Sequence, residues 1–111
     1  MASPSTVLVV DDDASIRFLC RVNLELEGHR VLEAQALDEA LAQVGEADTV
    51  LLDLHVGGLR GRELLDPLRA AHPGVRIVLL TGAAEVEPDL RAEVTAILGK
   101  PFTIENLLTA V

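Results

Sequence analysis

The stretch VLVVDDD at residues 7–13 carries the main signal for both the fold and the chemistry of this chain. Four apolar, mostly β-branched residues favour a buried strand, and three carboxylates follow directly at its end. Two carboxylates about 4 Å apart repel by roughly 4 kcal/mol at an effective dielectric constant near 20, so Asp11, Asp12 and Asp13 cannot all be buried as anions unaided. A divalent cation that prefers oxygen ligands, Mg²⁺ or Ca²⁺, would relieve this repulsion. Alternatively, one aspartate caps the next helix and the others are solvated.

The composition indicates one acidic domain with its own core. The chain has 111 residues, of which 50% are apolar. Its formal net charge of −9 argues against binding to nucleic acid or acidic membranes, which requires a basic face. The two aromatic residues, Phe18 and Phe102, offer no platform for base stacking, and the single cysteine, Cys20, excludes an intramolecular disulfide and favours a cytoplasmic location. We expect a flexible tail at residues 1–5 and one domain at residues 6–111.

Strand and helix patterns alternate five times along the chain. Short apolar runs predict further strands, and apolar residues at helical spacing predict helices. The expected strands after the first are 30–34, 48–52, 75–80 and 95–98, and the expected helices are 14–27, 37–44, 61–71, 87–93 and 102–111. We expect Ile16, Leu19, Cys20 and Leu24 on the inward face of the first helix, and a loop at 55–58. Continuous apolar strands joined by helices indicate a parallel sheet covered on both faces.

Polar residues lie just past the carboxyl ends of four of these strands. In an open parallel sheet, ligands bind outside the carboxyl ends of the strands, where the strand order reverses. The residues at these positions are Asp11, Asp12, Asp53, Thr81 and Lys100. The topology therefore predicts that all five lie along one edge of the sheet.

Four strand ends also carry a family resemblance. VLVVDDD (7–13), VLLDL (50–54), VLLTGA (78–83) and KPF (100–102) resemble, in the same order, the motifs of response-regulator receiver domains, the phosphoacceptor modules of two-component signalling. Each motif alone is weak, but the four together span nearly the whole chain. The resemblance implies a three-layer, doubly wound, five-stranded parallel sheet of order 2-1-3-4-5, called flavodoxin-like or CheY-like.

The resemblance assigns the acidic residues to a phosphorylation site. Asp53 would be the phosphoacceptor. Asp11 and Asp12 would bind Mg²⁺ together with Asp53 and the backbone carbonyl of His55. This assignment fits the chemistry, because phosphoryl transfer requires mainly positioning and the neutralisation of dispersed negative charge.

The resemblance also implies roles around the acids. Lys100 and the hydroxyl of Thr81 would bind oxygens of the phosphoryl group. The bond between Lys100 and Pro101 matches a cis peptide of the family. His55 and Ala83 lie two residues beyond Asp53 and Thr81, respectively. In the family, side chains at these positions flank the acyl phosphate and tune its hydrolysis. Alternatively, His55 is simply a solvent-exposed histidine of the loop.

Three departures from the family pattern concern the output of the switch. Ile97 stands where the family usually has an aromatic residue that moves with the hydroxyl of the Thr81 position. The segment between Thr81 and Ile97 is short, which predicts a shortened fourth helix. Residues 56–58 are Val-Gly-Gly where a proline is common, so this loop is expected to be more mobile. We therefore expect the phosphorylation chemistry to be intact and the coupling to partners to be altered.

The expected function is that of a stand-alone phosphoacceptor switch, because the chain ends at Val111. It would accept a phosphoryl group from a sensor histidine kinase or a histidine phosphotransfer protein and bind an unknown downstream protein, without nucleic-acid or membrane binding. Self-phosphorylation and autodephosphorylation that depend on Mg²⁺ are expected, but no separate catalytic domain. The alternatives are the receiver part of a longer DNA-binding regulator or hybrid kinase, and a degenerate receiver that works without phosphorylation. A flavodoxin-type cofactor protein is disfavoured, since acids replace the phosphate-cradling loop after the first strand.

Overall fold

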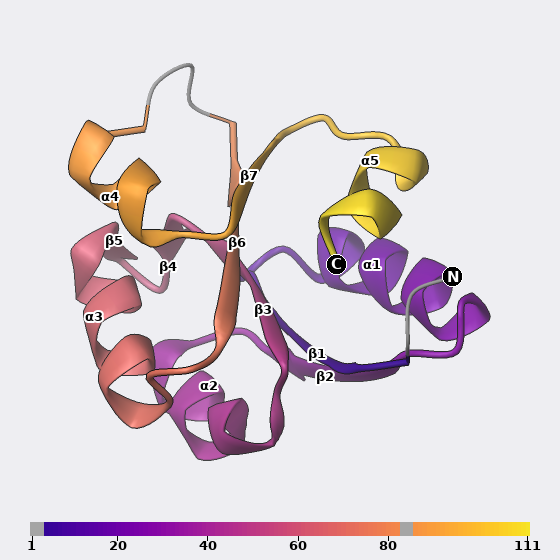
Figure 1. The fold of residues 1–111 in the computed structure, drawn as a ribbon, viewed down its shortest axis with the longest axis horizontal. Helices are drawn as coiled ribbons and strands as arrows, with labels where there is room; N and C mark the ends of the chain where they lie inside the picture. Colours follow the sequence, from indigo (N-terminus) through magenta and orange to yellow (C-terminus); the bar gives the residue numbers. More distant parts are fainter. Residues whose placement is uncertain (1–3, 83–85) are drawn as a thin grey trace.

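Five parallel strands form a sheet at the centre of the protein (Figure 1). The computed structural model describes residues 4–82 and 86–111. The strands of this sheet are β1 (Thr6–Val10), β2 (Arg30–Ala34), β3 (Thr49–Asp53), β6 (Arg76–Thr81) and β7 (Ala96–Gly99). Their order is β2-β1-β3-β6-β7, which is the predicted 2-1-3-4-5 order once β4 (His55–Val56) and β5 (Leu59–Arg60), which form a separate hairpin, are set aside. The doubly wound parallel fold is thereby confirmed.

Helices cover both faces of this sheet (Figure 1). On one face lie α1 (Ala14–Leu26) and α5 (Ile104–Ala110); on the other lie α2 (Leu37–Gln43), α3 (Arg62–Ala71) and α4 (Pro88–Glu93). A 3₁₀ turn (Val44–Glu46) extends α2. Within the described ranges, no helix is both long and apolar enough to cross a lipid bilayer.

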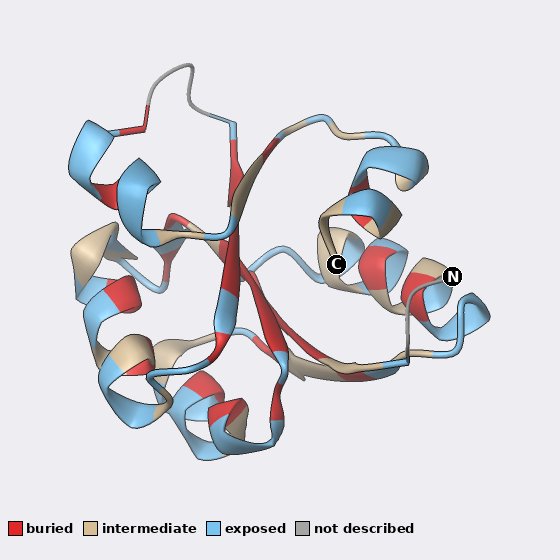
Figure 2. Cartoon of the chain, in the orientation of Figure 1, coloured by how far each residue is buried: buried red, intermediate tan, exposed pale blue. Residues whose placement is uncertain are grey.

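The core has two layers because neighbouring strand residues point to opposite faces of the sheet. Val7 and Val9 of β1 join the cluster under α1 and α5, whereas Leu8 and Val10 join the cluster under α2, α3 and α4. All four have no exposed surface. Figure 2 shows the same burial along the central strands. Full burial of a Val or Leu side chain contributes about 1.5–3 kcal/mol, so these strands fix the positions of the residues that follow them.

Two local predictions were wrong. Residues 55–58 are not a plain loop, because β4 and β5 pair antiparallel across Gly57 and Gly58. These glycines have φ values of 59° and 81°, the left-handed backbone that a two-residue hairpin turn requires. Leu19, predicted to face inward, is 39% exposed, because α1 buries a narrow stripe formed by Cys20 and Leu24.

The short helix α4 is attached to α3 by buried and charged contacts. Leu90 is buried in the core beneath it. On the outside, the guanidinium of Arg62 in α3 bonds Asp89 at 2.9 Å and also Glu93, both in α4, and pairs with Asp66 of its own helix at 3.1 Å. The hydrogen bond from Arg62 lowers the pKa of the Asp89 carboxyl below its usual range. The helix is short, as predicted, with six residues, and these contacts keep it attached to α3.

Candidate functional site

Three carboxylates meet where β1 and β3 end. Asp11 and Asp12 follow β1, and Asp53 is the last residue of β3. Because the two strands are neighbours and Val10 pairs with Leu52, Asp11 and Asp53 emerge at the same level of the sheet. One carboxylate oxygen from each of Asp11, Asp12 and Asp53 lies within 4.8 Å of the others. Hard oxygen ligands at this spacing fit Mg²⁺ or Ca²⁺.

The ammonium of Lys100 bridges two of these carboxylates. Its Nζ donates to Asp11 Oδ2 at 2.8 Å and to Asp53 Oδ2 at 3.4 Å. Lys100 follows β7, its backbone N–H donates to the carbonyl of Thr81 at 2.7 Å, and its bond to Pro101 is cis. The carboxylate of Asp11, which is fully buried, also accepts the backbone N–H of Asp13 at 2.9 Å. Asp11 is thus held by two donors.

The electrostatics of the site show an excess of negative charge. Burial, and then the charge of Asp11, raise the pKa of Asp53, against the opposing effects of the His55 N–H and Lys100. Burial disfavours the charged form of Lys100, but its hydrogen bond to Asp11 and the two carboxylate charges outweigh this, so its pKa is raised. The folded protein therefore disfavours the ionised form of Asp53, and a bound cation would stabilise that form.

Asp13 has a different role from its two neighbours. Its carboxylate accepts the backbone N–H groups of Ser15 at 2.8 Å and Ile16 at 3.4 Å, which makes it the N-cap of α1. The capping alternative therefore applies to the third aspartate of the run, and the cation-site alternative fits the first two.

The other predicted site residues surround the acids to different degrees. Thr81 ends β6 beside β3 and is buried. The backbone N–H of His55 donates to Asp53 Oδ1 at 3.3 Å, while its exposed imidazole lies 3.4 Å from Arg60 on the paired strand. Ile97 is partly buried and packs against the core on the side of α4. Ala83 lies outside the described residues.

Sequence reasoning missed Arg60, which the hairpin places beside His55. The two residues form the outer cross-strand pair of β4 and β5. Both line a cleft of about 590 Å³, and Glu87 lines it too. A two-glycine turn between residues 56 and 59 is a hairpin signal that would have indicated this pairing.

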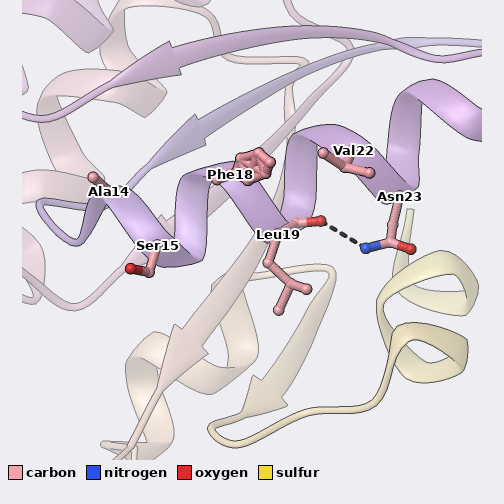
Figure 3. A pocket seen from close by; sticks show the side chains of 6 residues that line it. All are labelled: Ala14, Ser15, Phe18, Leu19, Val22 and Asn23. Carbon is pink, nitrogen blue, oxygen red and sulfur yellow. Dashed lines mark hydrogen bonds between the residues drawn. The ribbon is translucent and has the colours of Figure 1, made fainter.

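An apolar surface groove on α1 was also missed (Figure 3). Its volume is about 480 Å³, and it is lined by Ala14, Ser15, Phe18, Leu19, Val22 and Asn23. Phe18, one of the two aromatic residues of the chain, is 59% exposed. Figure 3 shows these side chains along one outer side of α1, with Asn23 nearest to α5. The groove begins at Ala14, the first residue of α1, which directly follows the acidic run in the sequence.

Comparison with known proteins identifies the class of this fold and site. A family model described as the response regulator receiver domain matches residues 7–111. A CheY-like receiver domain protein from Methanospirillum hungatei has a TM-score of 0.85 at 31% identity, covering 96% of this chain and 90% of that one. A response regulator from Burkholderia pseudomallei, solved with a phosphorylated aspartic acid, a calcium ion and citrate, has a TM-score of 0.82 at 31% identity, covering 96% and 65%. This chain belongs to the response regulator receiver family.

Relatives in sequence place the domain in several kinds of protein. Sporulation initiation phosphotransferase F of Bacillus subtilis is 30% identical over 95% of this chain and 89% of its own length. Two regulatory proteins are 32–34% identical, and the chain spans 47% and 24% of their lengths. Two sensor kinases are 32–33% identical, and this chain spans 11–12% of their lengths. Receiver domains are phosphoacceptors rather than separate catalytic enzymes, and the cluster of Asp11, Asp12 and Asp53 is compatible with the Mg²⁺ site of the family.

Proposed function

We propose that this chain is a phosphoacceptor switch in which Asp53 receives a phosphoryl group from a phosphohistidine of a sensor histidine kinase or a histidine phosphotransfer protein. The observation that carries the proposal is the convergence of Asp11, Asp12 and Asp53 within 4.8 Å, with Lys100 bridging two of them. The phosphorylated aspartic acid of the related Burkholderia protein supports it.

The residues divide the work of transfer. Asp11, Asp12, Asp53 and the backbone carbonyl of His55 would hold Mg²⁺, which supplies the positive charge that a phosphoryl group in transfer requires. An oxygen of Asp53 forms the new bond to phosphorus as the bond to the donor imidazole nitrogen breaks. Lys100 is a point charge on a flexible stem, so it can turn from the carboxylates to a phosphoryl oxygen.

The direct test is phosphorylation of the purified chain by acetyl phosphate with and without Mg²⁺. We expect the intact mass to increase by one phosphoryl group only with Mg²⁺, and beryllofluoride with Mg²⁺ to shift backbone NMR signals around Asp53. In the same spectra, an altered output would appear as small shifts in α4 and β7, because Ile97 has no aromatic ring to relocate. If neither reagent changes the protein, the degenerate-receiver alternative holds instead.

His55 is expected to protect the acyl phosphate from water. Its side chain stands on the hairpin directly after Asp53, with Arg60 beside it. Replacing His55 with alanine should shorten the phosphoryl lifetime roughly 3-fold, a change of less than 1.4 kcal/mol in the barrier to hydrolysis. The measurement is the decay of the phosphorylated mass after removal of acetyl phosphate. His29→Ala, at the opposite end of the sheet, should leave the decay unchanged, and equal lifetimes in all three proteins would refute a role for His55.

The groove on α1 is proposed to bind the protein that donates the phosphoryl group. It is apolar and exposed, and it lies on the helix that begins directly after the acidic run, so a donor whose histidine reaches Asp53 is expected to cover it. Aromatic anchors at interfaces commonly contribute 2 kcal/mol or more. Phe18→Ser should therefore slow transfer from a phosphorylated histidine phosphotransfer protein by about tenfold or more.

The control for this prediction is a change of donor. Phosphorylation of Phe18→Ser by acetyl phosphate should equal that of the wild type, because a small donor does not need the groove. Leu41→Ser, at an exposed apolar position on α2, should affect neither reaction. Equal slowing with both donors would show that Phe18 supports the fold and not docking.

A further inference from the structure

A charged side chain of α1 reaches back to the backbone of the acidic site. Arg17 donates from one terminal guanidinium nitrogen to the carbonyl oxygen of Asp11 at 2.7 Å, and from Nε to Glu33 Oε1 at 3.2 Å. Its side chain is only 15% exposed. We propose that Arg17 is a positioning residue that sets the affinity of the site for Mg²⁺. This inference rests on the proposed function.

The contact with the carbonyl of Asp11 matters because of the residue that follows. This carbonyl belongs to the peptide unit that joins Asp11 to Asp12, and a peptide unit is rigid and planar. Fixing the direction of its C=O therefore also fixes where the backbone of Asp12 begins. The Asp11 carboxylate has its own donors in Lys100 and the Asp13 N–H, whereas Asp12 is exposed. Arg17 thus aligns the less restrained member of the pair.

Glu33 on β2 anchors this arginine. Its carboxylate accepts from Arg17 and, through its second oxygen, from Arg21 at 2.7 Å. Charge-assisted bonds from a planar guanidinium hold both partners in a defined orientation. The guanidinium of Arg17 also brings a positive charge beside the backbone of Asp11. The chain from Glu33 through Arg17 to Asp11 therefore connects the β2 strand to the acidic loop.

Arg21 is a matched control within the same cluster. It shares Glu33 with Arg17 and also lies 3.7 Å from Glu25 of its own helix, but the backbone group that it bonds is the carbonyl of Val31 at 3.3 Å, on β2 and not in the acidic loop. If both arginines served only to attach α1 to β2, neither would change the affinity of the site for Mg²⁺. A positioning role predicts that only Arg17 affects the binding of Mg²⁺.

The experiment measures Mg²⁺ binding to the full chain by isothermal titration calorimetry, since the sequence has no Trp or Tyr to report by fluorescence. Removal of a group that orients metal ligands typically weakens metal affinity 10–100-fold. We expect the Mg²⁺ dissociation constant to rise about tenfold in Arg17→Gln and less than about twofold in Arg21→Gln. In acetyl phosphate reactions, Arg17→Gln should need more Mg²⁺ for half-maximal rate and reach a near-normal rate at saturation.

The outcomes separate this inference from the proposed function. If the wild type binds Mg²⁺ and both glutamine variants bind it equally well, the positioning role is overturned and the phosphoacceptor proposal stands. If the wild type binds no Mg²⁺, both are overturned. Should Arg17→Gln not fold, Arg17→Lys replaces it, because a lysine keeps the positive charge but lacks the planar guanidinium that bonds two acceptors at once. An unchanged dissociation constant in that variant would likewise overturn the inference.

Discussion

Replacing Asp53 with asparagine should abolish the phosphorylation of this protein. An asparagine amide has no anionic oxygen to attack phosphorus. The substitution also removes one of the three carboxylates whose oxygens lie within 4.8 Å of one another. We expect no gain of mass with acetyl phosphate and no response to beryllofluoride, under conditions in which the wild type shows both. Asp38→Asn, at an exposed position in α2, is the matched control and should react like the wild type.

The same variant should be more stable than the wild type in the absence of Mg²⁺. Burial and the charge of Asp11 raise the pKa of Asp53, so the native state favours the protonated form. The favourable contribution of such a group is complete below its unfolded pKa and is lost as the pH rises through its folded pKa, which leaves ionised Asp53 destabilising at neutral pH. Asp53→Asn removes this charge, and its Tm at pH 7 should rise.

Phosphorylation of Asp53→Asn at the wild-type level would place the phosphoacceptor elsewhere.

Replacing Lys100 with methionine should have the largest effect on stability. Lys100 is the only lysine of the sequence, and its ammonium lies 2.8 Å from Asp11, which is fully buried. Loss of one partner from a buried ion pair costs about 3–5 kcal/mol, because the other charge stays buried. Since the Lys100 side chain is 22% exposed, we expect a loss of about 2–3 kcal/mol in the free energy of unfolding without Mg²⁺. Urea denaturation followed by circular dichroism measures it.

A second substitution tests the cause of this loss. Asp11→Asn combined with Lys100→Met removes both charges, so the double variant should recover most of the stability lost in Lys100→Met. The raised pKa of Lys100 gives a further test, because its contribution is present below the ordinary lysine value of 10.5 and is lost as the pH rises through the folded pKa. The wild type should therefore lose its advantage over Lys100→Met only in strongly alkaline solution. A double variant no more stable than Lys100→Met would argue that the aliphatic stem, and not the charge, supports the fold.

Much of the fold and the edge that carries the site was predictable from residue order. A continuous apolar run such as residues 7–10 predicts a strand buried on both faces. The alternation of strands and helices then restricts the sheet to few topologies. The carboxyl ends of parallel strands share one edge, so Asp11 and Asp53 could be placed together without coordinates. A short fourth helix was likewise expected from the short segment between Thr81 and Ile97, and α4 has six residues.

Other features depended on which side chains the packed elements bring within reach. Asp13 became a helix cap, and Asp12 stayed in the acidic cluster, because the turn into α1 points their carboxylates in different directions. Leu19 faces solvent because contact with the sheet, and not helical periodicity alone, sets the width of the buried stripe. Arg17 reaches the carbonyl of Asp11 because Glu33 on a strand distant in sequence holds its guanidinium there. The alternation of strands and helices follows from local patterns of polarity, whereas such contacts require the mutual placement of α1, β1 and β2, which exists only in the folded chain.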